Sequence, residues 1–251
     1  MKITRKDFLR LSGLSLLAAG GREAIRAVAQ RNAPAAALPR KTRWGMVIDL
    51  GKCRDGCTDC VKACNATHNI PQLAQRAHEV KWIWTDPFSK VFPFAQSGYS
   101  ASQESAAPVP LLCNHCENPP CTRVCPTQAT WKREDGVVMM DWHRCIGCRY
   151  CIAACPYGSR SFNWEDPRPA LAAVNPDFPT RTKGVVEKCN FCEERLAEGR
   201  KPACVEACTS GAFVFGNLAD PDSEPRKLLR ARFAIQREPE LGTGPSIYYL
   251  V

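Results

Sequence analysis

The sequence of 251 residues lacks any apolar run long enough to cross a bilayer, which takes about 20 residues. The apolar stretch from Leu11 to Gly21 is too short, and no other segment is apolar enough. A nucleotide-binding glycine loop, a Ser/His/Asp arrangement and paired carboxylates are also missing, so we do not expect the chain to turn over a substrate alone. Because no segment is long and apolar enough to span a bilayer, we expect any contact with a membrane to depend on a partner protein.

Cysteine, by contrast, is abundant. The chain has sixteen cysteines, which fall into four groups of four with none left over. The groups are Cys53, Cys57, Cys60 and Cys64; Cys113, Cys116, Cys121 and Cys125; Cys145, Cys148, Cys151 and Cys155; and Cys189, Cys192, Cys204 and Cys208. Such grouping predicts four sites that each take four thiolates.

The third group has the spacing of a bacterial ferredoxin. It reads C-x2-C-x2-C-x3-C and is followed by Pro156, and the second group repeats it with two extra residues before the third cysteine. In this pattern three thiolates wrap one 4Fe-4S cluster, and the fourth points toward a second cluster. Ala129 to Trp131 and Val137 to Met140 flank a turn at Glu134 to Gly136, so the two groups predict a two-cluster ferredoxin domain with a strand pair.

Disulfides and structural zinc are the plain alternatives for so many cysteines. Disulfide frameworks have no need of repeated C-x2-C spacing, and zinc typically takes two well-separated C-x2-C pairs. The first group also has the spacing of radical-SAM enzymes, but Cys64 supplies a fourth thiolate and no β/α repeats follow. The histidines are expected to pack or to donate hydrogen bonds near the clusters rather than bind iron: His68, His78, His115 and His143.

The net charge of +9 could suggest nucleic acid or an anionic membrane as a partner. Residues 1–29 carry six basic and two acidic residues, which leaves +5 on the remainder. Four oxidised clusters with their thiolates would add about −2 each, which brings the loaded protein to roughly −3. The chain also has no motif that combines basic and stacking aromatic residues. The basic residues are therefore expected to balance the clusters, and nucleic-acid binding is not expected.

The N-terminus has the plan of a signal peptide. A basic segment, Thr4 to Arg10, precedes the apolar stretch, and Ala27 to Ala29 fits a cleavage site of small residues. The flank resembles a twin-arginine (Tat) signal, from which it departs at Lys6. Because clusters are inserted in the cytoplasm, export of the folded protein fits this route. An ordinary amphipathic helix is the alternative for residues 1–29, and 30–43 form a linker.

Several further elements are expected from local patterns. Strands are expected at Trp44 to Asp49, around Ile83, at Gly184 to Lys188 and at Ala212 to Phe215. Helices are expected at Glu193 to Glu198, closed by Gly199, and at Arg226 to Ile235. The apolar C-terminus, Ser246 to Val251, is expected to pack as a tail on the surface.

The order of the four groups after a Tat-like leader resembles the four-cluster ferredoxin subunits of the complex iron–sulfur molybdoenzyme family. The resemblance covers nearly everything from Trp44 to Asn217. It implies an α+β fold of two interleaved bacterial-ferredoxin-like domains with loop insertions. The outer domain would comprise 44–112 plus 170–220, the inner domain 113–169, and a C-terminal helix and tail 221–251.

The resemblance also implies which cysteines share a cluster, all four clusters being 4Fe-4S. Fourth cysteines are exchanged between paired groups. The expected sets are Cys53, Cys57, Cys60 and Cys208 for cluster 1; Cys189, Cys192, Cys204 and Cys64 for cluster 2; Cys113, Cys116, Cys121 and Cys155 for cluster 3; and Cys145, Cys148, Cys151 and Cys125 for cluster 4.

Three longer segments are similar to the DsrO family, the extracytoplasmic ferredoxin subunits of DsrMKJOP complexes. They are Cys155 to Arg168, Phe178 to Gly199 and Leu241 to Leu250. In archaea such subunits belong to heterodisulfide-reductase-like menaquinol oxidoreductases. The implied partners are an NrfD-like membrane protein with a quinone site, a multihaem cytochrome c, and a cytochrome b with a cytoplasmic iron–sulfur subunit.

These observations predict an electron-transfer subunit on the extracytoplasmic side of the membrane in sulfur metabolism. By analogy the Cys145 group would lie nearest the membrane partner, with Tyr157 and Arg160 lining that contact. Three alternatives remain: the iron–sulfur subunit of a molybdopterin enzyme of the polysulfide or tetrathionate reductase type, a structural zinc protein, and a soluble cytoplasmic ferredoxin.

Overall fold

The largest sheet joins the two ends of the described chain. The computed structural model describes residues 42–95 and 108–251, so the predicted leader and nearly all of the linker lie outside it. Strand β1 (Trp44–Asp49) pairs with β8 (Phe213–Asn217) antiparallel and with β10 (Ile247–Leu250) parallel. Strand β9 (Ala234–Ile235) adds the edge, which gives the order β8-β1-β10-β9.

The C-terminus is an inner strand of this sheet, so the expected surface tail is wrong. Ile247, Tyr249 and Leu250 are fully buried, and β10 has a neighbouring strand on each side. In this respect β10 resembles β1, whose Met46, Val47 and Ile48 are also fully buried. A short apolar run at a chain end gives no local sign of which strand it will pair with.

The expected strand pair between the second and third cysteine groups is confirmed. Strand β4 (Thr130–Lys132) pairs antiparallel with β5 (Val138–Met140). Gly136 has a φ of 88° in the connecting turn, a conformation that favours glycine. Two more antiparallel pairs complete the strands: β2 (Ile83–Pro87) with β3 (Pro108–Leu112), and β6 (Ser161–Phe162) with β7 (Val186–Glu187).

The helices of the described residues are short. The predicted helix at Glu193 is confirmed, and Gly199 follows it with a φ of 73°. The helix expected at Arg226 to Ile235 begins earlier and ends at Ala231, because Ala234 and Ile235 pair with β10 instead. The helices are α2 (Asp59–Thr67), α3 (Phe88–Val91), α5 (Pro120–Arg123), α6 (Tyr150–Ala153), α7 (Glu193–Ala197), α8 (Ala203–Glu206) and α9 (Glu224–Ala231).

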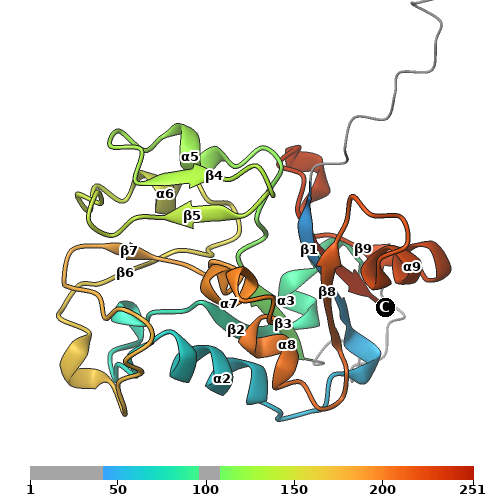
Figure 1. Ribbon diagram of the computed structural model, residues 1–251, viewed down its shortest axis with the longest axis horizontal. Coiled ribbons are helices and arrows are strands. Elements are labelled where there is room, and N and C mark those ends of the chain that lie inside the picture. Colours follow the sequence, from blue (N-terminus) through green and yellow to red (C-terminus); the bar gives the residue numbers. More distant parts are fainter. Residues whose placement is uncertain (1–41, 96–107) are drawn as a thin grey trace, which may run out of the picture. The chain divides into compact units, whose positions relative to one another are not determined.

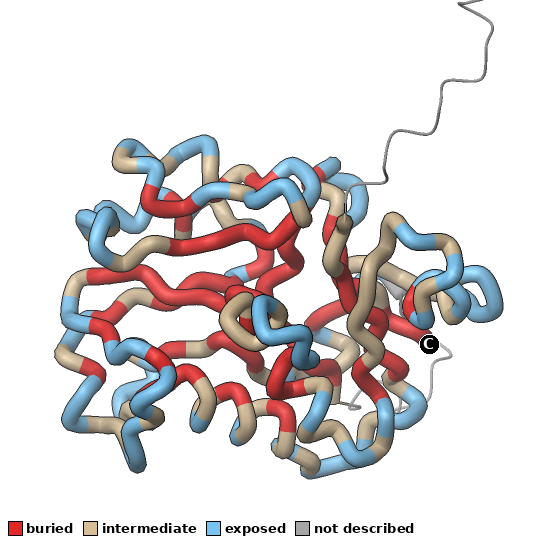
Figure 2. The backbone as a smooth tube through the Cα atoms, in the orientation of Figure 1, coloured by how far each residue is buried: buried red, intermediate tan, exposed pale blue. Residues whose placement is uncertain are grey.

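Two groups of buried side chains form the core. The smaller lies under the β4–β5 pair and includes Ala129, Val138 and Val186. The larger spans the main sheet and the β2–β3 pair. Figure 1 shows that α5 and α6 lie beside the β4–β5 pair, whereas α2 and α8 lie away from that pair. The buried segments in Figure 2 follow the strands.

The described ranges contain no helix that is both long enough and apolar enough to pass through a membrane.

Candidate metal centres

The four cysteine loops share one backbone feature. In each group the residue directly before the second cysteine has a positive φ, between 41° and 69°. A left-handed residue at this point turns the chain, which lets the first two thiols of a group face the same side. The residues are Gly56, His115, Gly147 and Phe191.

The third cysteine of each group also has a fixed place. It is the second residue of a short helix, as Cys60 in α2 and Cys121 in α5 illustrate. In the last three groups a left-handed residue lies three positions beyond the fourth cysteine, and its N–H donates to that cysteine's carbonyl. The first group differs because α2 continues past Cys64 to Thr67.

Gly147→Ala is expected to lower the iron content of the third group. An added Cβ would collide with the carbonyl oxygen of Gly184, and the φ of 69° costs a non-glycine residue about 1–2 kcal/mol. Gly56→Ala is the matched control, because Gly56 has the same φ with no atom within 4 Å of an added Cβ. The iron content of both variants is measured. Equal losses of iron in Gly147→Ala and Gly56→Ala would show that the close approach of Gly147 to Gly184 has no effect on cluster binding.

Electrostatic contacts between thiols show which cysteines lie together. Burial, together with the thiols of Cys53, Cys208 and Cys57, raises the pKa of Cys60 to about 12. Burial likewise raises the pKa of Cys64, with contributions from Cys189, Cys192 and Cys204. The fourth cysteine of the first group thus faces the fourth group, and Cys208 faces the first.

Thiols of the two inner groups also lie together. Burial raises the pKa of Cys116 to about 12, with further contributions from Cys113, Cys121 and Cys155. These four thiols line one enclosed cavity, although Cys155 belongs to the third group. Cys151 lies near Cys121 and Cys145, and Cys125 and Cys145 pack against the buried cluster that contains Cys121 and Cys151.

The chemistry of these thiols fits an iron–sulfur cluster. All sixteen cysteines are free. In the described residues, the group of three potential ligands whose donor atoms lie within 4.8 Å of one another is His68, Cys192 and Glu194, and no three thiols lie that close. A zinc ion at about 2.3 Å from each sulfur would bring its thiolates to about 3.8 Å of one another. The thiols are therefore spaced for a larger group than a single ion.

Arg160 is a buried cation between the inner thiols. Its guanidinium donates to Thr130 Oγ1 at 2.9 Å, and it is 5% exposed. Burial acts to lower its pKa, but the thiolate charges of Cys121, Cys151 and Cys113 outweigh this effect, so the pKa is raised. A guanidinium placed here offsets the negative charge of two thiol sets.

Tyr157 is buried as well, at 3% exposed, and its hydroxyl lies 2.5 Å from Thr243 Oγ1. Burial raises its pKa to about 12. Both side chains are thus largely buried, and Arg160 also lines the groove beside Cys148. The expectation that Tyr157 and Arg160 line a partner contact stays a prediction.

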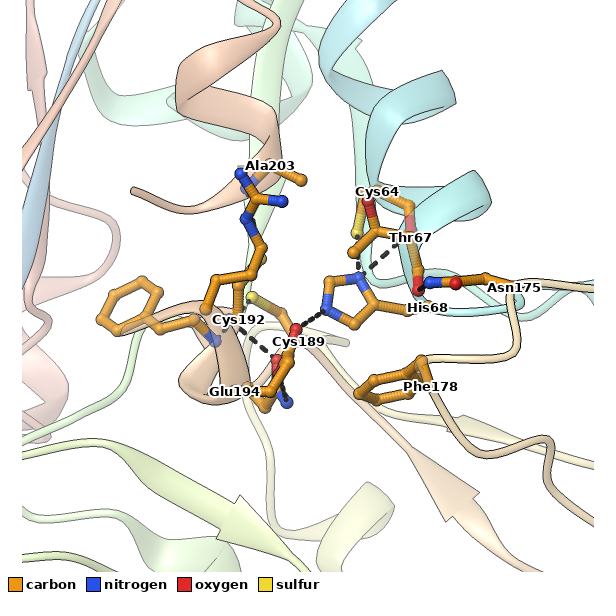
Figure 3. A network of polar contacts seen from close by, with 12 residues as sticks. Cys64, Thr67, His68, Asn175, Phe178, Cys189, Cys192, Glu194 and Ala203 are labelled. Carbon is orange, nitrogen blue, oxygen red and sulfur yellow. Dashed lines mark hydrogen bonds and ion pairs between the residues drawn. The ribbon is translucent and has the colours of Figure 1, made fainter. Parts of the chain in front are cut away.

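The histidines pack around the thiols to different degrees. His68 stacks on Trp82 at 4.6 Å between ring centroids, and its Nε2 lies 2.9 Å from Glu194 Oε1. Its Nδ1 lies 3.6 Å from Cys64 Sγ, as Figure 3 shows. His115 is fully buried, whereas His143 is exposed.

Recurrent thiol loops, in which thiols of two groups lie together, are features of an iron–sulfur protein with paired clusters. The 4Fe-4S dicluster domain family matches residues 106–169 and 175–218. The Hdr-like menaquinol oxidoreductase iron-sulfur subunit 1 of Archaeoglobus fulgidus is 40% identical, over 98% of this chain and 97% of the relative. The menaquinone reductase iron-sulfur cluster-binding subunit of Nitratidesulfovibrio vulgaris is 38% identical, over 84% of this chain and 89% of the relative.

A polysulfide reductase subunit of Wolinella succinogenes is 35% identical, over 82% of this chain and 93% of the relative. The chain belongs to the family of iron–sulfur electron-transfer subunits that contains these proteins. It binds four 4Fe-4S clusters, for which its sixteen cysteines are sufficient. When bound, each cluster takes up and releases one electron. The chain itself supplies thiolates, excludes water and places cations beside them.

Sequence reasoning missed three buried charges, namely Lys188 and the paired Arg181 and Glu187. A weak signal existed, since Glu187 and Lys188 stand between apolar Val186 and Cys189. Charged residues inside an apolar strand, directly before a cysteine ligand, indicate that their charges have partners in the protein interior.

Proposed function

We propose that the chain is a four-cluster wire in which clusters 1, 2, 3 and 4 follow one another and electrons pass between neighbouring clusters. The electrostatic contacts of Cys60, Cys64 and Cys116 support three of the four expected cysteine sets. Clusters 1 and 2 then belong to an outer ferredoxin-like half and clusters 3 and 4 to an inner half. Without a catalytic constellation the chain does not turn over a substrate alone.

The proposed end of the wire toward the membrane is the face around Cys148. Cys148 is exposed, whereas the other cysteines are buried or half-buried. Ile146 is 66% exposed and Tyr150 62% exposed, and a groove beside them is lined by Phe162 and Trp164. Exposed apolar side chains next to a cluster ligand favour contact with another protein.

The proposed partner at this face is an NrfD-like integral membrane subunit with a quinone site. The names of the Archaeoglobus and Nitratidesulfovibrio relatives, which refer to menaquinol and menaquinone, support a quinone as the source or sink of electrons. A multihaem cytochrome c, a cytochrome b and a cytoplasmic iron–sulfur subunit complete a complex of the DsrMKJOP type. The Tat-like leader supports a place on the extracytoplasmic side. The resemblance to DsrMKJOP complexes supports a role in sulfate respiration.

Purification from native membranes tests this assignment. A tag placed after Val251, which is exposed, leaves β10 undisturbed. We expect a multi-span quinone protein and a multihaem cytochrome c to accompany the chain after anaerobic solubilisation. Co-purification of a molybdopterin subunit instead would favour the second candidate, to which the similarity with the polysulfide reductase subunit lends support. Recovery of the chain alone from the cytoplasm would contradict both.

A further inference from the structure

Lys188 is a fully buried lysine directly before the first cysteine of the fourth group. It is 1% exposed and follows β7, in which Glu187 points to the opposite face and pairs with Arg181. Its ammonium donates to the carbonyl of Val138 and, at 2.7 Å, to the carbonyl of Cys189. Within the described part of the chain, no carboxylate pairs with it.

Two carbonyl groups do not balance a buried positive charge. Removing an ammonium from water is costly, and a buried cation is retained where an anion compensates it. The negative groups that face Lys188 are the thiols of Cys113, Cys121 and Cys189, whereas Arg160 repels it. Cys113 and Cys121 belong to the set of cluster 3, and Cys189 to the set of cluster 2.

The same place is the junction between the two ferredoxin-like halves. His115 and Phe191, the left-handed residues of the second and fourth groups, stack with their ring centroids 3.7 Å apart. Cys113 contributes to raising the pKa of Cys189, so thiols of both sets lie close here. No cysteine is exchanged across this junction, in contrast to the pairs within each half. Lys188 is a buried charged side chain that reaches across, from Cys189 to Val138.

We propose that Lys188 is the shared counter-charge of clusters 2 and 3 and raises the midpoint potential of both. An electron that crosses the junction oxidises one cluster and reduces the other, with no proton or bond exchanged. Each reduction adds one negative charge beside the ammonium, so the cation stabilises the reduced form. The proposal rests on the proposed function, in which these cysteines hold clusters 2 and 3.

Lys188→Met in the full-length, anaerobically purified holoprotein tests this role. The potentials of all four clusters are measured by redox titration followed by EPR, and iron is determined on the same samples. We expect two of the four potentials to fall, each by at least a tenfold change in the equilibrium constant, or about 59 mV for one electron. The matched control is Lys201→Met, which removes an exposed lysine of the same cysteine group and leaves the four potentials unchanged.

Four unshifted potentials in a Lys188→Met protein with full iron content would overturn the proposal. If Lys188→Met loses iron, Lys188→Arg, which restores the positive charge, is measured next. Full iron content in Lys188→Arg supports the role of Lys188 as a counter-charge. An equal loss of iron in Lys188→Arg overturns the proposal and shows that Lys188 acts through packing. A wild-type protein that contains no iron–sulfur clusters would instead refute the proposed function, so the two failures are distinguishable.

Discussion

Cys148→Ser is expected to remove one of the four clusters and to stop quinol-linked electron transfer. Cys148 is exposed, so the substitution removes a ligand without disturbing the core. Iron should fall from about sixteen to about twelve atoms per chain if the cluster is lost whole. One EPR signal should disappear while the other three persist. Reduction of the remaining clusters by quinol, in the complex isolated from membranes, is the activity to be measured.

Ile146→Ser is the control for this substitution. Ile146 lies in the same loop and is exposed, but it carries no thiol. We expect it to retain all four EPR signals. Quinol-linked transfer that continued at the wild-type rate in Cys148→Ser, with one cluster missing, would place that cluster off the electron path.

Arg181→Met is expected to destabilise the protein by about 3–5 kcal/mol, the effect of removing one partner of a buried ion pair. Arg181 Nη2 lies 2.7 Å from Glu187 Oε2, and both side chains are fully buried. Glu187 also accepts hydrogen bonds from Trp82 at 3.0 Å and Asn163 at 2.6 Å. The substitution leaves the carboxylate buried without its cation. Unfolding of the holoprotein, followed by loss of cluster absorbance, measures the change.

An exposed ion pair provides the comparison. Arg200 and Glu198 lie 3.3 Å apart with both side chains more than half exposed, and such pairs contribute about 0–1 kcal/mol. Arg200→Met should therefore leave stability nearly unchanged. The double substitution of Arg181 and Glu187 by Met should be less harmful than Arg181→Met alone. A small effect of Arg181→Met would show that the buried pair does not secure the β6–β7 region.

Local rules explain what could be predicted from the sequence. The β4–β5 pair follows from two apolar runs and a turn with Gly136, all within a few residues of one another. The helix at Glu193 was likewise predictable, because its closing glycine is adjacent in sequence. The spacing of cysteines predicted their grouping for the same reason: the first three thiols of a group lie in one short loop.

Long-range contacts explain the features of the structure that could not be predicted from the sequence. Strand β10 pairs with β1, about two hundred positions earlier in the chain, and nothing in its own residues predicts this partner. Arg160 and Tyr157 follow a cluster ligand on a loop, which suggested exposure. Their partners Thr130 and Thr243 lie far away in sequence, and these contacts draw both side chains inward. The burial of Lys188 beside Val138 depends on the same kind of contact.

The content of iron and acid-labile sulfide tests the central claim most directly. The chain is purified anaerobically, with its own membrane partners, and both elements are measured per polypeptide. The arrangement of the thiols predicts about sixteen iron atoms and about sixteen sulfides for each chain. A protein that contained about four zinc ions and no iron, or cysteines joined by S–S bonds, would contradict it.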